Sequence, residues 1–142
     1  PRVGLINVGE EEQKGSLLTQ AAYQLLKQNP NINFTGNIEG RDIYADKADV
    51  MICDGFVGNI ILKSSEAIYP LLKKRDFTDK FIEMFHWESV GGSPILGVNG
   101  NVVIGHGSSG VFAIQNMILF AKNIAVSEIS KKIKSAYSKV SF

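Results

Sequence analysis

The sequence predicts an α/β fold with a largely parallel sheet and covering helices. As far as Pro70, short apolar segments alternate with helical patterns in the order strand, helix, strand, loop, strand, helix. Glycine-containing polar loops follow the predicted strands, as is typical of crossover connections between parallel strands. The 142 residues are 44% hydrophobic and 20% charged, which predicts one globular domain with a real core rather than a disordered chain.

The first two strands flank a helix. Arg2 to Val8 is apolar and partly β-branched, so it predicts a strand. Ser16 can cap a helix that runs to about Gln28, because its hydroxyl can accept an unpaired helix N–H. Asn29-Pro30-Asn31 ends this helix, and Ile32 to Thr35 predicts the second strand. Apolar residues at helical spacing predict one buried stripe on the helix, formed by Leu18, Ala21, Ala22, Leu25 and Leu26.

The central stretch joins an apolar run, Val50–Cys53, to a helix that starts near Val57 and ends near Pro70. The run predicts a buried strand. Strand, glycine-containing loop and helix together are typical of an anion site, since a helix N-terminus offers unpaired N–H groups and partial positive charge. Asn59 and Lys63 lie one helical turn apart, so they share a face that suits phosphate or a carbonyl oxygen. The same pattern also fits a plain strand–turn–helix junction.

The second half predicts an amphipathic helix, a hairpin and a long helix. Asp76–Glu88 places its aromatic residues along one helical face. After a turn at Gly91–Pro94, two strands, Ile95–Val98 and Val102–Ile104, are predicted to join at Asn99-Gly100-Asn101. Ser108 or Ser109 can cap the helix that follows. The buried stripe of that helix is predicted at Ile114, Met117, Ile118, Ala121, Ile124, Ala125, Ile129 and Ile133.

Composition excludes several classes of function. The net charge of +1 argues against a nucleic-acid binder driven by global charge. Cys53 is the only cysteine, which excludes an internal disulfide and a cysteine-based zinc cluster and fits a reducing compartment. No metal-ligand cluster and no apolar run long enough to span a bilayer occur in the sequence. The chain begins at Pro1 with a strand almost at once, which predicts a piece of a longer protein.

Two further loops carry chemistry. In Gly36–Asp42, Arg41 can reach an anion bidentately or pair with Glu39. In Gly105–Gly110, small residues, two hydroxyls and the imidazole of His106 lie between a predicted strand and a helix. Together with Asp54–Lys63, these loops predict a shared cleft at the carboxyl edge of the sheet.

An ordered set of segments resembles the phosphate acyltransferases of bacterial phospholipid synthesis, the family called PlsX. Order and spacing agree over nearly the whole chain. The connection from Pro70 to Gly91 looks shorter than is usual in the family, and Gly110 stands where an acidic residue commonly follows the two serines. The matching segments are Val3–Glu11 with Lys14-Gly15, Gly36–Asp42, Asp54–Asn59 with Lys63, Gly91–Pro94, Leu96–Gly100 and His106–Ser109.

The resemblance covers the family's C-terminal portion, residues 1–142 here, and implies an absent upstream α/β portion with a glycine- and aspartate-rich opening. It implies a three-layer Rossmann-like fold of the isocitrate/isopropylmalate dehydrogenase type. It also implies transfer of a fatty acyl group from acyl carrier protein to inorganic phosphate, without a cofactor. Homodimers, a cytoplasmic location and loose contact with the inner face of the membrane are expected of the family.

The resemblance and the residue chemistry together predict the site. Asn59 and Lys63 are expected to bind phosphate or the thioester oxygen. His106 is expected to donate a hydrogen bond or to protonate the departing thiolate. No metal ligand is expected. The predicted substrate-binding residues are Asn37, Glu39, Arg41, Asp54, Gly55, Gly58, Asn99 and Ser108.

Three other interpretations remain open. The chain could be a non-catalytic dimerisation or docking piece, with its contact at Lys73–Arg75 and the aromatic residues Phe77, Phe81 and Phe85. It could be an enzyme like the phosphate acetyltransferases, which act on coenzyme A thioesters. It could also be a dehydrogenase-like relative that uses a nicotinamide cofactor.

Overall fold

Strands and helices alternate through the first half of the chain in a computed structural model that describes residues 1–138. The strands are β1 (Arg2–Ile6), β2 (Asn33–Ile38), β3 (Val50–Ile52), β4 (Ser93–Ile95) and β5 (Val102–Ile104). The helices are α1 (Leu17–Gln28), α2 (Gly55–Lys73), α3 (Lys80–Glu83), α4 (Val111–Ser127) and α5 (Ile129–Tyr137), with two short 3₁₀ helices, η1 (Gly40–Asp42) and η2 (Trp87–Ser89).

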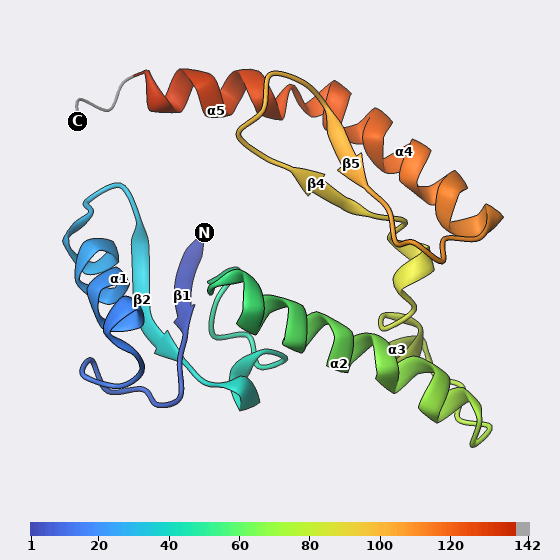
Figure 1. The fold of residues 1–142 in the computed structure, drawn as a ribbon, viewed down its shortest axis with the longest axis horizontal. Coiled ribbons are helices and arrows are strands. Elements are labelled where there is room, and N and C mark those ends of the chain that lie inside the picture. The colour runs from blue at the N-terminus through green and yellow to red at the C-terminus, as the bar shows by residue number, and fades with distance from the viewer. Residues whose placement is uncertain (139–142) are drawn as a thin grey trace. The chain divides into compact units, whose positions relative to one another are not determined.

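β1 is the centre of a three-stranded parallel sheet with the order β2-β1-β3. Figure 1 shows β1 and β2 side by side. The predicted α/β class with a parallel sheet is therefore confirmed. The buried core of this sheet consists of Val3 and Leu5 of the central strand β1 and Ile38 of β2. β2 begins one residue later than predicted and continues three residues further, so Gly36–Ile38 is strand rather than loop.

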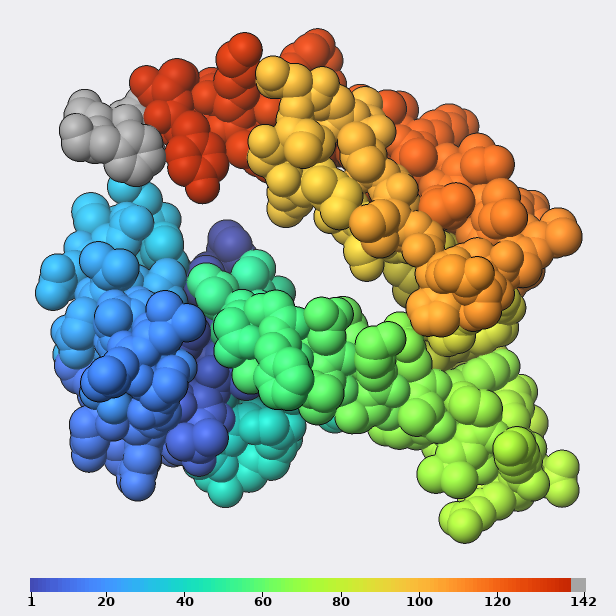
Figure 2. All heavy atoms as spheres, viewed as in Figure 1, coloured from blue at the N-terminus to red at the C-terminus, as the bar shows by residue number. Residues whose placement is uncertain are grey.

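α1 begins as predicted, with the Ser16 hydroxyl accepting a hydrogen bond from the Thr19 N–H at 3.2 Å. The predicted buried stripe is wrong in part, because Leu18 and Leu25 are 70% and 72% exposed, whereas Ala22 and Leu26 are half-buried. The helix contacts β2 through another face, where the rings of Tyr23 and Phe34 meet edge to face at 5.1 Å. Figure 2 shows the atoms of α1, in shades of blue, at the surface of the molecule.

β3 ends one residue earlier than predicted and is only half-buried, since it pairs with β1 alone and Val50 is 44% exposed. α2 begins at Gly55, two residues before the predicted start. It also passes through Pro70 and ends at Lys73. Pro70 has no N–H to donate to the carbonyl oxygen of Glu66, and its ring crowds that carbonyl, so the cost falls on the turn that precedes Pro70.

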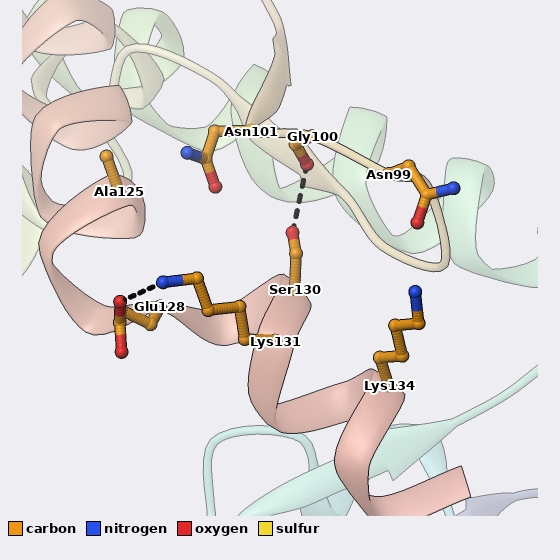
Figure 3. Close-up of a pocket in the computed structure, with 8 residues that line it drawn as sticks. All are labelled: Asn99, Gly100, Asn101, Ala125, Glu128, Ser130, Lys131 and Lys134. Atoms are coloured by element: carbon orange, nitrogen blue, oxygen red, sulfur yellow. Dashed lines mark hydrogen bonds and ion pairs between the residues drawn. The ribbon is translucent and has the colours of Figure 1, made fainter. Parts of the chain in front are cut away.

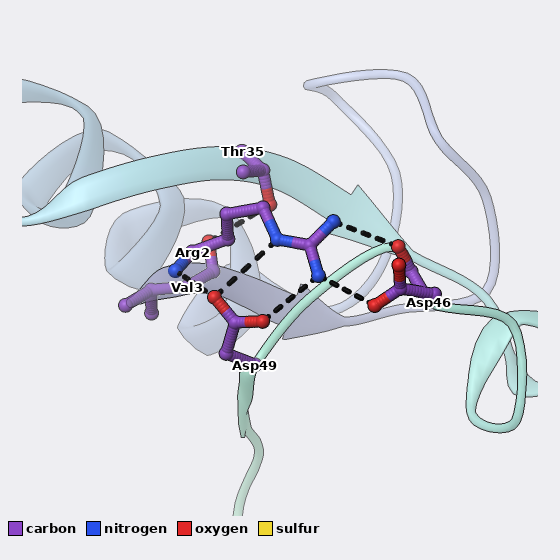
Figure 4. Close-up of polar contacts among 5 residues, drawn as sticks. All are labelled: Arg2, Val3, Thr35, Asp46 and Asp49. Carbon is purple, nitrogen blue, oxygen red and sulfur yellow. Dashed lines mark hydrogen bonds and ion pairs between the residues drawn. The ribbon is translucent and has the colours of Figure 1, made fainter.

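Arg2 ties the start of β1 to the loop before β3 (Figure 4). Its backbone N–H donates to Asp49 Oδ2 at 2.6 Å, and its guanidinium contacts both Asp49 and Asp46. On the other side of β1, the Thr35 hydroxyl donates to the carbonyl oxygen of Val3 at 3.1 Å. These contacts supplement the sheet hydrogen bonds where β1 begins.

The predicted amphipathic helix Asp76–Glu88 is wrong. Only Lys80–Glu83 is α-helical, followed by the 3₁₀ turn η2. Asp76 adopts a left-handed conformation with φ 58°, which breaks the helical path directly after α2. His86 then stacks on Tyr69 of α2 with ring centroids 4.4 Å apart, and this contact favours a compact turn over a continuous helix.

The predicted hairpin is confirmed, but with a different first strand. β4 is Ser93–Ile95 rather than Ile95–Val98, and it pairs antiparallel with β5, Ser93 lying opposite Ile104. The predicted turn at Gly91–Pro94 therefore partly belongs to the strand. The loop between the strands, residues 96–101, includes the Asn-Gly step that predicted it.

The predicted long C-terminal helix is two helices. Glu128 has φ 53°, a left-handed conformation that interrupts the helical hydrogen bonding between α4 and α5. Ile124 of the predicted stripe is buried, as is Ala113 outside it, whereas Ile114 and Ile118 of the stripe are 44% and 64% exposed. Gly110 occupies the N-cap of α4, so the predicted caps by Ser108 or Ser109 are wrong.

The chain divides into two units, Pro1–Leu62 and Lys63–Phe142, of which the second is described as far as residue 138. The first contains the parallel sheet with α1, and the second contains the hairpin with α3, α4 and α5. In the second unit, α4 contacts both η2 and β5. Within residues 1–138, no helix combines the length and the apolar character that crossing a bilayer requires.

Candidate functional site

The carboxyl ends of three parallel strands meet at one edge of the first sheet. Asn7 follows β1, Glu39 follows β2, and Asp54 lies two residues after β3. In parallel sheets this edge is where ligands bind, because loops and helix N-termini converge there. The sheet topology thus brings the Gly36–Asp42 segment and Asp54, the first residue of the predicted Asp54–Lys63 segment, to the same edge.

Asn37 lies near the end of β2 and is buried, with 8% of its surface exposed. Its amide Nδ2 donates to the carbonyl oxygen of Glu11 at 2.8 Å, so it holds the loop after β1 in place. Its Oδ1 has no hydrogen-bond partner among the described residues. A buried acceptor without a partner is rare and costly, which leaves this atom available to a donor.

Lys47 pairs with two carboxylates at this edge. Its ammonium lies 2.8 Å from Glu10 and 2.9 Å from Asp42, which is buried. Hydrogen bonding to Lys47 lowers the pKa of both carboxyl groups and raises the pKa of Lys47 itself. Arg41 pairs with Glu39 at 3.0 Å and with Glu10 at 3.7 Å, so the structure adopts the paired alternative for Arg41.

Asp54 occupies the N-terminus of α2. One of its oxygens accepts hydrogen bonds from the N–H groups of Phe56 at 2.8 Å and Val57 at 2.9 Å. Two of the helix donors expected to meet an anion are therefore already engaged by this carboxylate. Gly55 and Gly58 lie in the first turn, and burial together with Asp54 raises the pKa of the neighbouring Cys53 thiol.

Asn59 and Lys63 both lie on α2 and are exposed to solvent. Because they are four residues apart within one helix, their side chains share a face, as predicted. This face lies beyond the first turn, so its polar groups are separate from the N–H groups that Asp54 caps.

His106 is held by its own loop in the second unit. Its Nδ1 lies 2.7 Å from the Ser108 hydroxyl and accepts a hydrogen bond from the Ser108 N–H at 3.2 Å. Because Nδ1 accepts, a neutral ring carries its proton on Nε2. The ring of Trp87 lies 4.8 Å from that of His106, centroid to centroid, and supports it on one side.

Glu88 lies at the N-terminus of α4. Its Oε1 accepts a hydrogen bond from the Gly110 N–H at 3.4 Å, and its Oε2 lies 3.4 Å from His86 Nε2. The resemblance implies an acidic side chain at position 110, where this chain has Gly110. In this chain a carboxylate from a residue distant in sequence reaches that position.

Asn99 precedes β5 and His106 follows it, so the two predicted residues lie beyond opposite ends of this strand and are not brought together. Asn99 instead lines a pocket of about 460 Å³ at the tip of the hairpin (Figure 3). Sequence reasoning missed Lys47, Trp87 and Glu88, because each has a partner far away in the sequence, Glu10, His106 and Gly110 respectively, and no local spacing marks these contacts.

Gly105–Gly110 has the spacing G-x-G-x-x-G that is typical of dinucleotide-binding turns. That motif works between a strand and a helix of a parallel βαβ unit. Here it follows β5, which pairs antiparallel in a two-stranded hairpin. The structural context of the motif is absent at this loop, and this counts against the nicotinamide alternative. No group of three or more His, Cys, Asp or Glu in residues 1–138 is placed to hold a metal ion.

Relatives of the chain are named phosphate acyltransferases. The protein of Halothermothrix orenii is 41% identical over 98% of this chain and 48% of its own length. That of Campylobacter jejuni subsp. doylei is 44% identical with the same coverage. The Syntrophomonas wolfei protein is 40% identical over 99% of this chain and 46% of its own length. The chain spans about half the length of the curated relatives it matches.

The alignment with the Halothermothrix orenii protein is 159 positions long, so that relative has residues in the matched stretch that this 142-residue chain lacks. The location predicted for this shortening is the connection from Pro70 to Gly91. A family described as "Fatty acid synthesis protein" matches residues 1–74, which include the parallel sheet and all of α2. The chain therefore belongs to this family of fatty acid synthesis proteins.

Proposed function

We propose that the chain is the C-terminal portion of an enzyme that transfers a fatty acyl group from acyl carrier protein to inorganic phosphate. The observation that carries this proposal is the match of nearly the whole chain to proteins named phosphate acyltransferase. The parallel sheet with α1 and α2 is compatible with the three-layer Rossmann-like fold that the resemblance implies. Acyl carrier protein as donor, acyl phosphate as product and a homodimeric assembly belong to the same proposal.

The reaction needs no covalent intermediate on the protein. A phosphate oxygen attacks the thioester carbonyl carbon, a C–O bond forms, the C–S bond breaks, and the thiolate leaves and takes up a proton. The protein must hold two reactants together and stabilise the oxyanion that develops. We propose that it does so without a cofactor, in the cytoplasm, with peripheral contact at the inner face of the membrane.

The capping of α2 by Asp54 affects where phosphate would bind. Because Asp54 engages the N–H groups of Phe56 and Val57, the exposed side chains of Asn59 and Lys63 are better placed for an anion than the helix N-terminus itself. An ammonium and an amide on one face supply charge and a directed donor.

His106 would serve the departing thiolate. A neutral imidazole with its proton on Nε2 can donate that proton, and the Ser108 N–H holds Nδ1 as an acceptor at 3.2 Å. Trp87 restricts the ring from one side. Asn37, Glu39 and Arg41 line the same sheet edge as Asp54 and would contribute to substrate binding.

The test is a phosphate-dependent acyl-transfer assay on the full-length protein that contains this chain. Acyl phosphate is trapped with hydroxylamine and quantified as the hydroxamate. Lys63→Ala and Asn59→Ala should each lower kcat/KM by about 100-fold, as removal of one oxyanion or phosphate donor typically does. Lys122→Ala, which removes an exposed lysine of α4, should leave it unchanged. Wild-type kcat/KM in both α2 variants would contradict these roles.

The same assay separates the alternatives. Faster turnover of acyl-coenzyme A than of acyl carrier protein would favour an enzyme like the phosphate acetyltransferases. Binding of acyl carrier protein without any turnover would favour a docking piece, for which Phe77 and Phe81 are 55% and 56% exposed.

A further inference from the structure

The pocket that Asn99 lines lies within the second unit, between the hairpin tip and α5, and is lined mainly by polar residues. Its volume is about 460 Å³, within the range of small-ligand sites. Figure 3 shows side chains of the hairpin loop and of α5 facing each other across it. The lining residues are Asn99, Gly100, Asn101, Ala125, Glu128, Ser130, Lys131 and Lys134.

Two features build this pocket. The Ser130 hydroxyl donates to the carbonyl oxygen of Gly100 at 3.0 Å, so the loop is tied to the first turn of α5. The left-handed conformation of Glu128 ends α4 and starts α5 in a new direction. Residues on either side of this break therefore line one wall, together with the first turn of α5 and the partial positive charge of its N-terminus.

The charge of the pocket is positive. Lys131 pairs with Glu128, which balances one ammonium. Lys134 has no ion-pair partner among residues 1–138, and Figure 3 shows it directed toward the loop that carries Asn99. From Ile129 to Ser138 the sequence contains three lysines and no acidic residue. An unbalanced ammonium therefore faces a loop whose two asparagine side chains can donate hydrogen bonds.

We propose that this pocket binds a phosphate group. Lys134 supplies the charge, the amides of Asn99 and Asn101 supply directed donors, and Lys131 adds a second cation when its pair with Glu128 opens. Phosphate gains more from two lysines than a carboxylate does, because it carries more charge and more acceptor oxygens. The inference does not depend on the proposed acyl transfer, and it gives Asn99 a role away from the sheet edge.

Three sources of phosphate share this chemistry: inorganic phosphate, the phosphate of a phosphopantetheine arm, and a lipid phosphomonoester. The full-length protein carrying Lys63→Ala is titrated with each, so that phosphate bound on α2 does not contribute. The probes are inorganic phosphate, pantetheine 4′-phosphate with pantetheine as its phosphate-free control, and vesicles containing phosphatidic acid. Dissociation constants are measured by calorimetry for the soluble probes and by sedimentation for the vesicles. The probe that binds most tightly identifies the source.

Lys134→Gln and Asn99→Asp, each added to Lys63→Ala, should weaken binding at least about tenfold, the effect of losing one charge-assisted hydrogen bond. Lys132→Gln is the matched control, since Lys132 lies on the same helix but does not line the pocket. Its affinity should remain unchanged. Failure of all three probes to bind, or an equal loss in Lys132→Gln, would overturn the proposal. Because the readout is binding, the phosphate-pocket proposal stands or fails separately from the proposed acyl transfer.

Discussion

Arg2 joins the start of β1 to a loop nearly fifty residues away through two aspartates. Its side chain lies 2.8 Å from Asp49 and 2.6 Å from Asp46. Hydrogen bonding from the Arg2 side chain and backbone lowers the pKa of Asp49 to about 2. Asp46 is 95% exposed and Asp49 only 46%, so solvent screens the first contact far more than the second.

This pair predicts a loss of stability in acid. The pKa of Asp49 lies at about 2 in the folded chain against 3.8 when unperturbed, so the folded state favours its charged form. The stabilisation is complete above the unperturbed pKa and is lost as the pH falls from there toward the folded value. Asp49→Asn should therefore lose less stability in this interval than the wild type. Urea unfolding at closely spaced acidic pH values measures the free energy of unfolding of both proteins.

Asp46→Asn is the control for this experiment, because the exposed Asp46 contact should contribute little and leave the pH dependence largely intact. A wild-type pH dependence in Asp49→Asn would show that this ion pair does not contribute to acid stability.

At the scale of elements, Gly91 sets how closely the segment before β4 approaches α4. Gly91 is buried with φ 86°, and an added Cβ would overlap the backbone nitrogen of Met117. Gly97, in the hairpin loop, has a similar φ of 80°, but an added Cβ there would meet nothing within 4 Å. The two glycines thus share a conformation and differ in their surroundings.

Gly91→Ala should lower the free energy of unfolding by at least about 3 kcal/mol, because it combines a strained backbone with a clash that no rotamer relieves. Gly97→Ala should cost only about 1 kcal/mol, the conformational penalty alone. Urea unfolding of both variants gives the comparison. Equal losses would mean that conformation alone, and not the packing against α4, decides the cost.

The two longest helices begin in a similar way. Asp54 accepts N–H groups of α2, and Glu88 accepts the N–H of Gly110 at the start of α4. The helix N-terminus that the sequence predicts as an anion site, that of α2, and the N-terminus of α4 thus each already contact a carboxylate from the chain itself. At α2, the proposed phosphate contact is therefore through side chains such as Lys63 rather than through the backbone N–H groups that Asp54 engages.

At the scale of the whole molecule, apolar side chains fall into two groups. The buried hydrophobic residues of the described chain are Val3, Leu5, Ile38, Ala113 and Ile124. Many others are more than half exposed, including Leu18 and Leu25 of α1. Stability should therefore depend on a small set of positions that hydrophobicity alone does not identify.

Leu5→Ala and Leu25→Ala test this division. Leu5 is 3% exposed, so its truncation should cost about 2–4 kcal/mol of unfolding free energy through lost burial and a cavity. Leu25 is 72% exposed, so the same truncation should change stability by less than about 0.5 kcal/mol. Urea unfolding followed by circular dichroism measures both. A comparable loss in the two variants would mean that α1 buries Leu25 in solution.

The sequence by itself determined the alternation of strands and helices, the Ser16 cap, the hairpin at Asn99–Asn101 and the family motifs. Apart from the order of the family motifs, which spans the chain, these features depend on residues within about four positions of one another, where backbone geometry and side-chain spacing act directly. The same local rules placed the buried stripe of α1 wrongly, because periodicity shows which face is apolar but not whether another element covers it.

Only the tertiary structure decided which charges meet. Lys47 joins Glu10 and Asp42, and Glu88 reaches Gly110, across separations of up to 37 residues. It also broke the predicted C-terminal helix at Glu128, where the turn into α5 forms one wall of the polar pocket. Such pairings depend on where the sheet and helices bring distant segments together, and no local spacing encodes that distance.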